Sequence, residues 1–285
     1  MSVNPRLNRL FNTDRKCFEV AMDHGVHNEP SFLPGLEDLK QAVSVVAASR
    51  ADAILLSLGQ ANFLQDLAGK NKPSLVVRAD PTNLYQSPAP NHVFCRLLEE
   101  VVEQALALDA ASIVANLLWV VDRPELYHQT VQNISRLKPM CSQFGMPLMV
   151  ESLVLTPNAD SSGYTSDSDI RKIVSLARQA VELGADIVKA DPSENLLEYS
   201  KVIQAASPRP VLVRGGSRVS DNEILSRTHV LMQQGAAGIV YGRNIYQHSH
   251  IERIIRACQA IVHEGASVSE ANSILTNDRL GAWQK

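Results

Sequence analysis

The segment "ELGADIVKAD" at residues 182–191 joins the end of an amphipathic stretch to a short apolar run through a glycine. The segments "QQGAAGIV" at 233–240 and "LDAASIV" at 108–114 resemble it. A glycine after the last helical turn is suited to a helix C-cap, and a run such as "ADIV" is typical of a buried strand. The repeated pattern predicts joints at which a helix leads into a strand.

Outward from these joints, eight apolar runs follow one another along the chain. They do not alternate with polar residues, as expected for parallel strands that are buried on both faces. Amphipathic segments such as 36–50 and 169–184 lie between them and predict helices. The eight runs are 18–25, 51–59, 74–80, 111–119, 147–153, 185–191, 210–216 and 236–244.

Eight alternations of strand and helix predict an α/β fold, a single (β/α)8 TIM barrel. An open doubly wound sheet is the structural alternative, but no G-x-G-x-x-G follows the first predicted strand. We expect one domain over residues 1–285, with one or two closing helices within 247–275 and a polar C-terminal tail at 276–285.

The composition is that of an ordinary globular protein, with 45% hydrophobic and 20% charged residues. The net charge of −3, without a long run of either sign, argues against nucleic-acid or membrane binding as the main activity. The four cysteines are far apart and predict free thiols rather than disulfides or a zinc site. Because the polar N-terminus lacks the apolar core of a secretory signal, we expect a cytoplasmic protein.

Charged residues gather at one end of the apolar runs, which in a barrel is the catalytic face. Lys189 and Asp191 lie at the end of the sixth run. Burial favours the neutral amine of a lysine, which can attack a carbonyl and form a Schiff base. The alternative is a lysine that only forms an ion pair with Asp23, Asp191 or Glu151. Two long loops, 80–94 and 156–169, follow strands and are expected to shape substrate specificity.

Asp23 is a candidate to move protons for such a lysine, or simply to pair with it. Asp23, His24 and His27 also form a D-H-x-x-H pattern. With Glu151, this pattern leaves a metal-dependent barrel enzyme as an alternative. The Schiff-base interpretation requires neither a metal nor a cofactor.

Two glycine-plus-arginine clusters, "VRGGSR" and "GIVYGRN", end the last two predicted strands. Phosphate sites in barrels are often built from the loops after these strands. Glycines let backbone N–H groups approach phosphate oxygens, and an arginine adds a charged donor. The clusters therefore predict a phosphate site that contains Gly215, Gly216, Gly242 and Arg243 or Arg218.

With these residues in place, the chain resembles the class I aldolase family of archaeal-type fructose-bisphosphate aldolases, which includes 2-amino-3,7-dideoxy-D-threo-hept-6-ulosonate synthase and the phosphorylated autoinducer-2 thiolase. The motifs that carry the resemblance are "MDHG" (22–25), "GADIVK" (184–189), the "GG" at 215–216, "GAAGIVYGRNIYQH" (235–248) and "AIVHEGASVSEA" (260–271). The resemblance implies that Lys189 is the Schiff-base lysine, that Asp23 is its acid/base partner, and that the glycines and Arg243 hold a substrate phosphate. It also implies a homo-oligomer, commonly a decamer.

The chain departs from the family after the fifth strand. The aldolase and synthase branches carry a Tyr-Pro-Arg-Gly pattern there, whereas this chain has Leu-Val-Leu-Thr at 153–156. Glu151 or Tyr164 is therefore a hypothetical replacement proton donor.

The leading expectation is a class I aldolase acting on a phosphorylated ketose, with reversible cleavage of fructose 1,6-bisphosphate to dihydroxyacetone phosphate and glyceraldehyde 3-phosphate as the best named activity. A Schiff-base acyl or ketol transferase and a non-catalytic sugar-phosphate-binding barrel remain alternatives.

Overall fold

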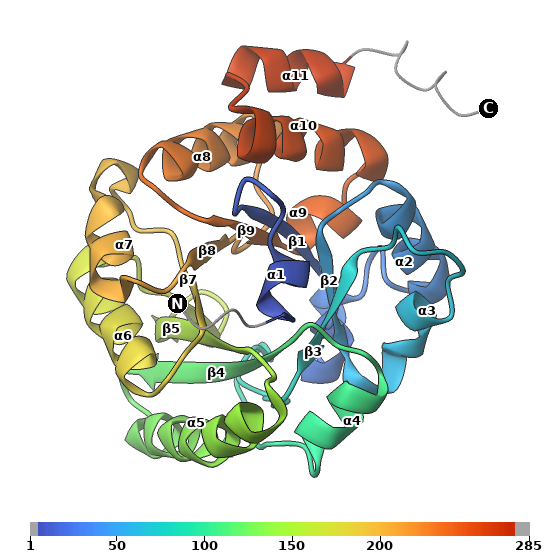
Figure 1. Ribbon diagram of the computed structural model, residues 1–285. Helices are drawn as coiled ribbons and strands as arrows, with labels where there is room; N and C mark the ends of the chain where they lie inside the picture. The colour runs from blue at the N-terminus through green and yellow to red at the C-terminus, as the bar shows by residue number, and fades with distance from the viewer. Residues whose placement is uncertain (1–4, 277–285) are drawn as a thin grey trace.

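The computed structural model describes residues 5–276 and contains a closed barrel of parallel strands inside a ring of helices (Figure 1). Neighbouring barrel strands pair in parallel in chain order, and the first strand pairs with the last, which closes the sheet. This closure confirms the predicted (β/α)8 TIM barrel and excludes the open sheet. The barrel strands are β1 (Cys17–Ala21), β2 (Ala53–Ser57), β3 (Ser74–Arg78), β4 (Ser112–Val120), β5 (Leu148–Asn158), β7 (Ile187–Ala190), β8 (Val211–Arg214) and β9 (Gly238–Tyr241).

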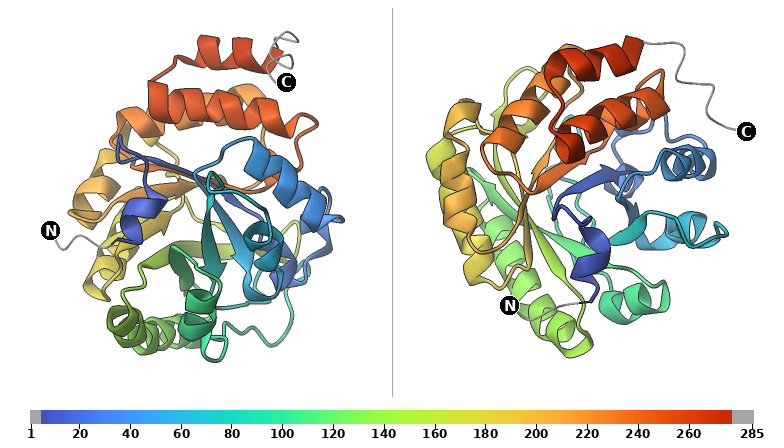
Figure 2. Two further views of the ribbon diagram at one scale, coloured as in Figure 1. Left: turned by 45° about the vertical axis from the view of Figure 1, so that its right-hand side comes forward. Right: turned by 45° about the horizontal axis from the view of Figure 1, so that its top comes forward.

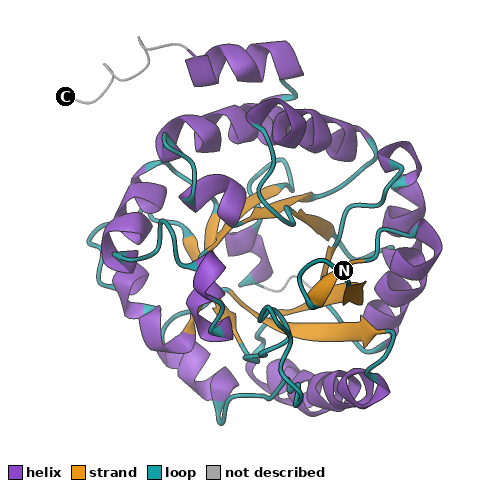
Figure 3. Cartoon of the chain, turned by 180° about the vertical axis from the view of Figure 1, so that it is seen from behind, coloured by secondary structure: helices purple, strands orange, loops and turns teal. Residues whose placement is uncertain are grey.

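Helices follow each barrel strand and cover the outside of the sheet (Figures 1 and 3). Along the chain they are α2 (Leu39–Ala48), α3 (Asn62–Gln65), α4 (Val101–Ala107), α5 (Pro124–Phe144), α6 (Ile170–Glu182), α7 (Ser200–Ala206), α8 (Asp221–Gln233) and α10 (Ile251–Glu264). Shorter elements lie in the connections: η1 (His24–His27), η2 (Pro30–Phe32), η3 (Leu58–Gln60), η4 (Leu196–Glu198) and α9 (Arg243–Tyr246).

The two ends of the barrel differ. Helix α1 (Leu7–Leu10) lies across the end that faces the viewer in Figure 1, and Leu10 packs there against the barrel interior. Figure 3 looks onto the opposite end, where the loops after the strands converge. Helix α11 (Val268–Thr276) packs outside the ring against α10 and α8 (Figure 2). The carboxyl ends of the parallel strands lie at the end away from α1, where a site can form.

The helix-to-strand joints share one backbone feature. Gly184 and Gly235 follow α6 and α8 with φ values of +98° and +97°, and Asp109 takes a φ of +54° at the third joint. Glycine adopts this left-handed region at no steric cost. The resemblance among the three sequence segments therefore reflects a residue with positive φ at each joint.

One sequence expectation is wrong. The segment 156–169 is not wholly an irregular loop, because β5 runs on to Asn158 and pairs antiparallel with β6 (Gly163–Ser166). Tyr164 and Thr165 favour a strand, and the Asn158 side chain accepts a hydrogen bond from the Asp160 N–H at the turn. The segment is a hairpin on the loop face of the barrel.

Within residues 5–276 no helix is both long and apolar enough to span a bilayer. Of the expected polar tail, Thr276 ends α11 and residues 277–285 lie outside the described part of the chain.

Candidate active site

A ring of charged side chains lies in the open end of the barrel. Arg78, Glu151, Lys189 and Arg214 each follow, two residues later, an apolar residue of the barrel interior. Because side chains two apart on a strand face the same way, all four point inward, one step nearer the carboxyl ends. The interior residues before them are Val76, Met149, Ile187 and Leu212.

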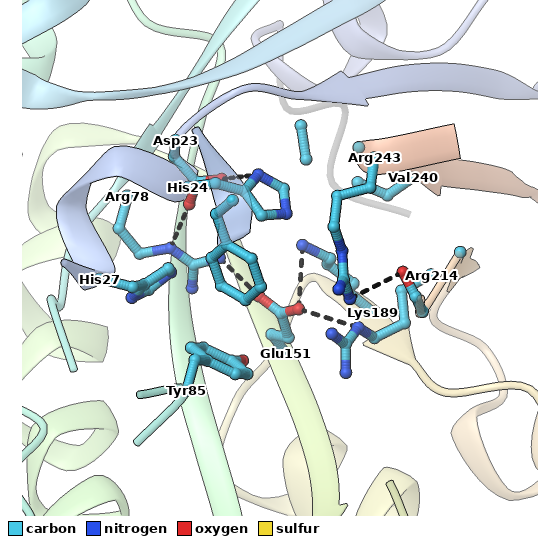
Figure 4. A pocket seen from close by; sticks show the side chains of 15 residues that line it. Asp23, His24, His27, Arg78, Tyr85, Glu151, Lys189, Arg214, Val240 and Arg243 are labelled. Atoms are coloured by element: carbon cyan, nitrogen blue, oxygen red, sulfur yellow. Dashed lines mark hydrogen bonds and ion pairs between the residues drawn. The ribbon is translucent and has the colours of Figure 1, made fainter. Parts of the chain in front are cut away.

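Glu151 stands at the centre of this ring (Figure 4). Its Oε1 lies 3.0 Å from Lys189 Nζ and 3.6 Å from Arg214 Nε, and its Oε2 accepts a hydrogen bond of 2.6 Å from Arg78 Nη2. Burial acts to raise the pKa of Glu151, but the charges of Lys189, Arg78 and Arg214 outweigh it and hold that pKa well below the usual range. An ionised Glu151 accepts hydrogen bonds and positions the lysine; in this state it has no proton to donate.

Asp23 is joined to the same ring through Arg78 rather than through Lys189. Arg78 Nε donates to Asp23 Oδ2 at 2.8 Å, so one guanidinium links Asp23 and Glu151 (Figure 4). Burial favours a raised pKa for Asp23, but the neighbouring Arg78 charge lowers it to about 2. Asp23 is therefore an ionised carboxylate that can accept a proton.

This arrangement does not support the metal-dependent alternative. The Arg78 guanidinium binds both carboxylates, Asp23 and Glu151, that would have had to share a cation. Within the described residues, no three His, Cys, Asp or Glu side chains are grouped to hold a metal ion.

The predicted phosphate residues line the same pocket as Lys189. Gly215, Gly216, Gly242 and Arg243 all contribute to its wall. Arg243 Nη2 donates to the Gly216 carbonyl at 3.1 Å. Its Nε is buried and has no hydrogen-bond partner within the described chain. A buried donor without a partner is costly, so this arginine is suited to an anion bound from the pocket.

Gly242 and Arg243 are each constrained by a neighbouring ring. A Cβ on Gly242 would lie 2.4 Å from Cε1 of His24, so no larger residue fits beside that imidazole. The Arg243 guanidinium lies 4.8 Å from the centre of the Phe32 ring, a cation–π contact that helps to fix its direction.

Two predicted residues lie elsewhere. Arg218 is not part of the pocket wall; its Nη1 donates to the Gln247 carbonyl on the surface. The Tyr164 hydroxyl accepts from Arg123 Nε at 2.8 Å and contacts Asp122. It too lies outside the pocket, so the geometry does not support it as a proton donor.

Sequence reasoning missed Arg78 and Arg214, although a signal was present. Each ends an apolar run, "SLVVR" and "PVLVR", in the way that Lys189 ends "ADIVK". It also missed Tyr85, which the loop after β3 brings into the pocket wall. Nothing in the sequence of that loop marks the tyrosine.

The fold and the site define a (β/α)8 barrel with a buried lysine and a glycine–arginine cluster at its open end. A family model described as "DeoC/LacD family aldolase" matches residues 17–248. The chain belongs to this aldolase family, as the sequence motifs indicated.

Sequence relatives agree with this placement, and a solved structure shares the fold. An uncharacterized aldolase of Saccharolobus solfataricus is 29% identical over 276 residues, covering 95% of this chain and 97% of the relative. A 3-hydroxy-5-phosphonooxypentane-2,4-dione thiolase of Klebsiella pneumoniae is 28% identical, with 97% and 86% covered. The crystal structure of an archaeal fructose 1,6-bisphosphate aldolase superposes with a TM-score of 0.74 at 22% identity, covering 92% of this chain and 99% of that one.

Proposed function

We propose that the protein is a class I, Schiff-base enzyme that breaks or forms a carbon–carbon bond in a phosphorylated ketose. The observation that carries the proposal is the position of Lys189. Its side chain is 4% exposed, and its amine is held by Glu151. It lines the same pocket as Arg243, Gly215, Gly216 and Gly242. A lysine amine beside an anion site is the arrangement needed to capture a phosphorylated carbonyl compound.

In this mechanism the Lys189 amine attacks the substrate carbonyl, and loss of water leaves an iminium ion. Asp23, as an ionised carboxylate, accepts the proton of the hydroxyl on the β carbon. The bond between the α and β carbons then breaks, an aldehyde leaves, and the electron pair moves into the iminium to give an enamine. Protonation of the enamine and hydrolysis return the free lysine.

Phosphate recognition falls to Arg243 and the glycines that line the same pocket. Arg243 supplies a charged donor whose Nε is otherwise without a partner in the described chain, and Gly216 and Gly242 line the pocket beside it. The same interactions fit the proposed partner, a phosphorylated small molecule. A homo-oligomer remains part of the proposal.

Fructose 1,6-bisphosphate is the first substrate to test, with dihydroxyacetone phosphate and glyceraldehyde 3-phosphate as products. A second candidate, Schiff-base acyl or ketol transfer, is favoured by one observation: Leu153 stands where the aldolase branches have a tyrosine. The relatives named as thiolases, at 28% identity, support the same alternative. Absolute dependence of turnover on coenzyme A would identify the acyl transferase.

The test is covalent trapping. The protein is incubated with dihydroxyacetone phosphate, reduced with borohydride and mapped by peptide mass spectrometry. We expect a reduced adduct on Lys189 that is absent from Lys189→Ala. Absence of any adduct across a panel of phosphorylated ketoses, together with ligand-dependent thermal stabilisation, would instead identify a non-catalytic binding barrel.

A further inference from the structure

Arg214 is more open to the pocket than the other members of the ring of charged side chains. Its side chain is 15% exposed, whereas those of the other three are 3% or 4% exposed. Arg214 ends β8, directly before Gly215 and Gly216 of the predicted phosphate cluster, and all three residues line the pocket. Of the two guanidinium groups in the ring, that of Arg214 is therefore the one that a bound molecule can reach more readily.

The contacts of Arg214 leave part of its guanidinium group unused. Nη1 donates to Asp191 Oδ1 at 3.0 Å, and Nε lies 3.6 Å from Glu151 Oε1, which is too far for a good hydrogen bond. Nη2 forms no hydrogen bond with the described residues and is not fully buried. Because every guanidinium nitrogen carries N–H donors, Arg214 is anchored by Asp191 and still has donors for a ligand.

Arg214 and Arg243 carry like charges in the same pocket. Figure 4 shows both side chains extending into the pocket that Lys189 lines. Burial lowers the pKa of Arg243, and among the charged groups Arg214 has the largest effect in the same direction. Both arginines have donors without a partner in the described chain, Arg243 Nε and Arg214 Nη2. An anion between them would replace the repulsion of two cations with charge-assisted hydrogen bonds.

Arg214 also lies close to the reacting amine. Lys189 Nζ is 3.0 Å and Arg214 Nε is 3.6 Å from the same atom, Glu151 Oε1. An anion bound by Arg214 would therefore lie beside the carbonyl that Lys189 attacks. In dihydroxyacetone phosphate the phosphate is attached to the carbon next to the carbonyl, which fits this short separation.

We propose that Arg214 is a second phosphate-binding residue, which joins Arg243 in holding the substrate phosphate next to Lys189. This inference rests on the proposed Schiff-base function and extends its phosphate site. Arg214 contributes charge and hydrogen bonds to binding and takes part in no bond-breaking step. The competing explanation is that Arg214 only positions Glu151. In that case its loss would impair the reaction of Lys189 with every carbonyl compound to the same extent, whether phosphorylated or not.

The test compares two carbonyl compounds that differ only in the phosphate group. The protein is treated with sodium cyanoborohydride and either dihydroxyacetone phosphate or dihydroxyacetone, and the second-order rate constant for labelling Lys189 is measured by mass spectrometry. The ratio of the two rate constants reports phosphate recognition. In Arg214→Met this ratio should fall at least tenfold. In the control Arg218→Met, which changes an arginine outside the pocket wall, it should equal the wild-type ratio.

A second variant guards against misfolding of Arg214→Met. Arg214→Lys keeps a positive charge beside Asp191 and Glu151 but loses the planar guanidinium group, and it should lower the ratio roughly threefold. An unchanged ratio in Arg214→Lys, or equal losses for the two compounds in Arg214→Met, overturns the proposal.

A further measurement requires no reaction at Lys189. Isothermal titration calorimetry with inorganic phosphate at pH 8 should show roughly fivefold weaker binding to Arg214→Lys than to the wild type, and unchanged binding to Arg218→Met. Equal affinities of the wild type and Arg214→Lys, or no binding to the wild type, contradict the proposal. Absence of labelling by either carbonyl compound, combined with phosphate binding that depends on Arg214, would contradict the Schiff-base function instead.

Discussion

Lys189 and Glu151 are direct partners in the neighbouring strands β7 and β5, and their side chains meet at 3.0 Å. Both side chains are only 4% exposed. Because the register and the shared inward face fix both residues, the amine is held in one place before any substrate binds. The position of the Lys189 amine therefore depends on Glu151.

Replacing Glu151 with glutamine should impair catalysis, whereas replacing Tyr164 with phenylalanine should not. Glu151→Gln leaves Lys189, Arg78 and Arg214 around a neutral amide, which allows the lysine to move; we expect roughly a 100-fold loss in kcat/KM. Tyr164 contacts Arg123 and Asp122 outside the pocket. Steady-state kinetics over a pH series checks both variants, and equal losses would contradict the assigned positions.

Arg78→Met should destabilise the fold as well as the site. The guanidinium is 3% exposed and bridges two buried carboxylates, Asp23 and Glu151. Removing it leaves buried negative charges without their partner, which costs about 3–5 kcal/mol. Urea unfolding at pH 7 measures the loss. Because protonation neutralises the unpaired carboxylates, the difference from the wild type should shrink as the pH falls; a difference independent of pH would argue against the bridge.

The role of Arg243 in phosphate binding can be tested with Arg218 as the control. Arg243→Ala removes a half-buried cation from the pocket wall, and loss of charged hydrogen bonds should raise KM for a phosphorylated substrate roughly 10- to 100-fold. Arg218→Ala removes the same charge from the surface, where Arg218 contacts the Gln247 carbonyl. It should leave KM unchanged. An effect of Arg218→Ala as large as that of Arg243→Ala would mean that the phosphate binds elsewhere.

Glu19 on β1, which is buried without a hydrogen-bond partner among the described residues, should make the folded protein less stable as the pH rises. Burial raises its pKa in the folded state to about 7, above the usual 4.5, so the folded state binds more protons than the unfolded state between these values. Stability is therefore lost as the pH rises from about 4.5 to 7. Glu19→Gln removes this dependence and should be more stable than the wild type at pH 8 by an amount on the order of 3 kcal/mol. Urea unfolding of both proteins at pH 5 and pH 8 checks the sign; a constant difference contradicts it.

The sequence alone was sufficient for the barrel, because strand and helix periodicity and the turns at the joints are local properties. The charge at the end of "ADIVK" and the glycine–arginine clusters also identified Lys189, Gly215, Gly216, Gly242 and Arg243, all of which line one pocket. In a parallel barrel every strand ends on the same face, so position along a strand already indicates the side of the molecule.

Only the tertiary structure decided which charged groups meet. Lys189 contacts Glu151 rather than Asp23, Arg78 links Asp23 to Glu151, and Glu19 is buried without a partner among the described residues. These contacts depend on the register of strands that are distant in the chain and on closure of the barrel. A sequence pattern indicates which face of the sheet a residue lies on and which end of its strand it is near. It does not indicate which residue it contacts across the barrel.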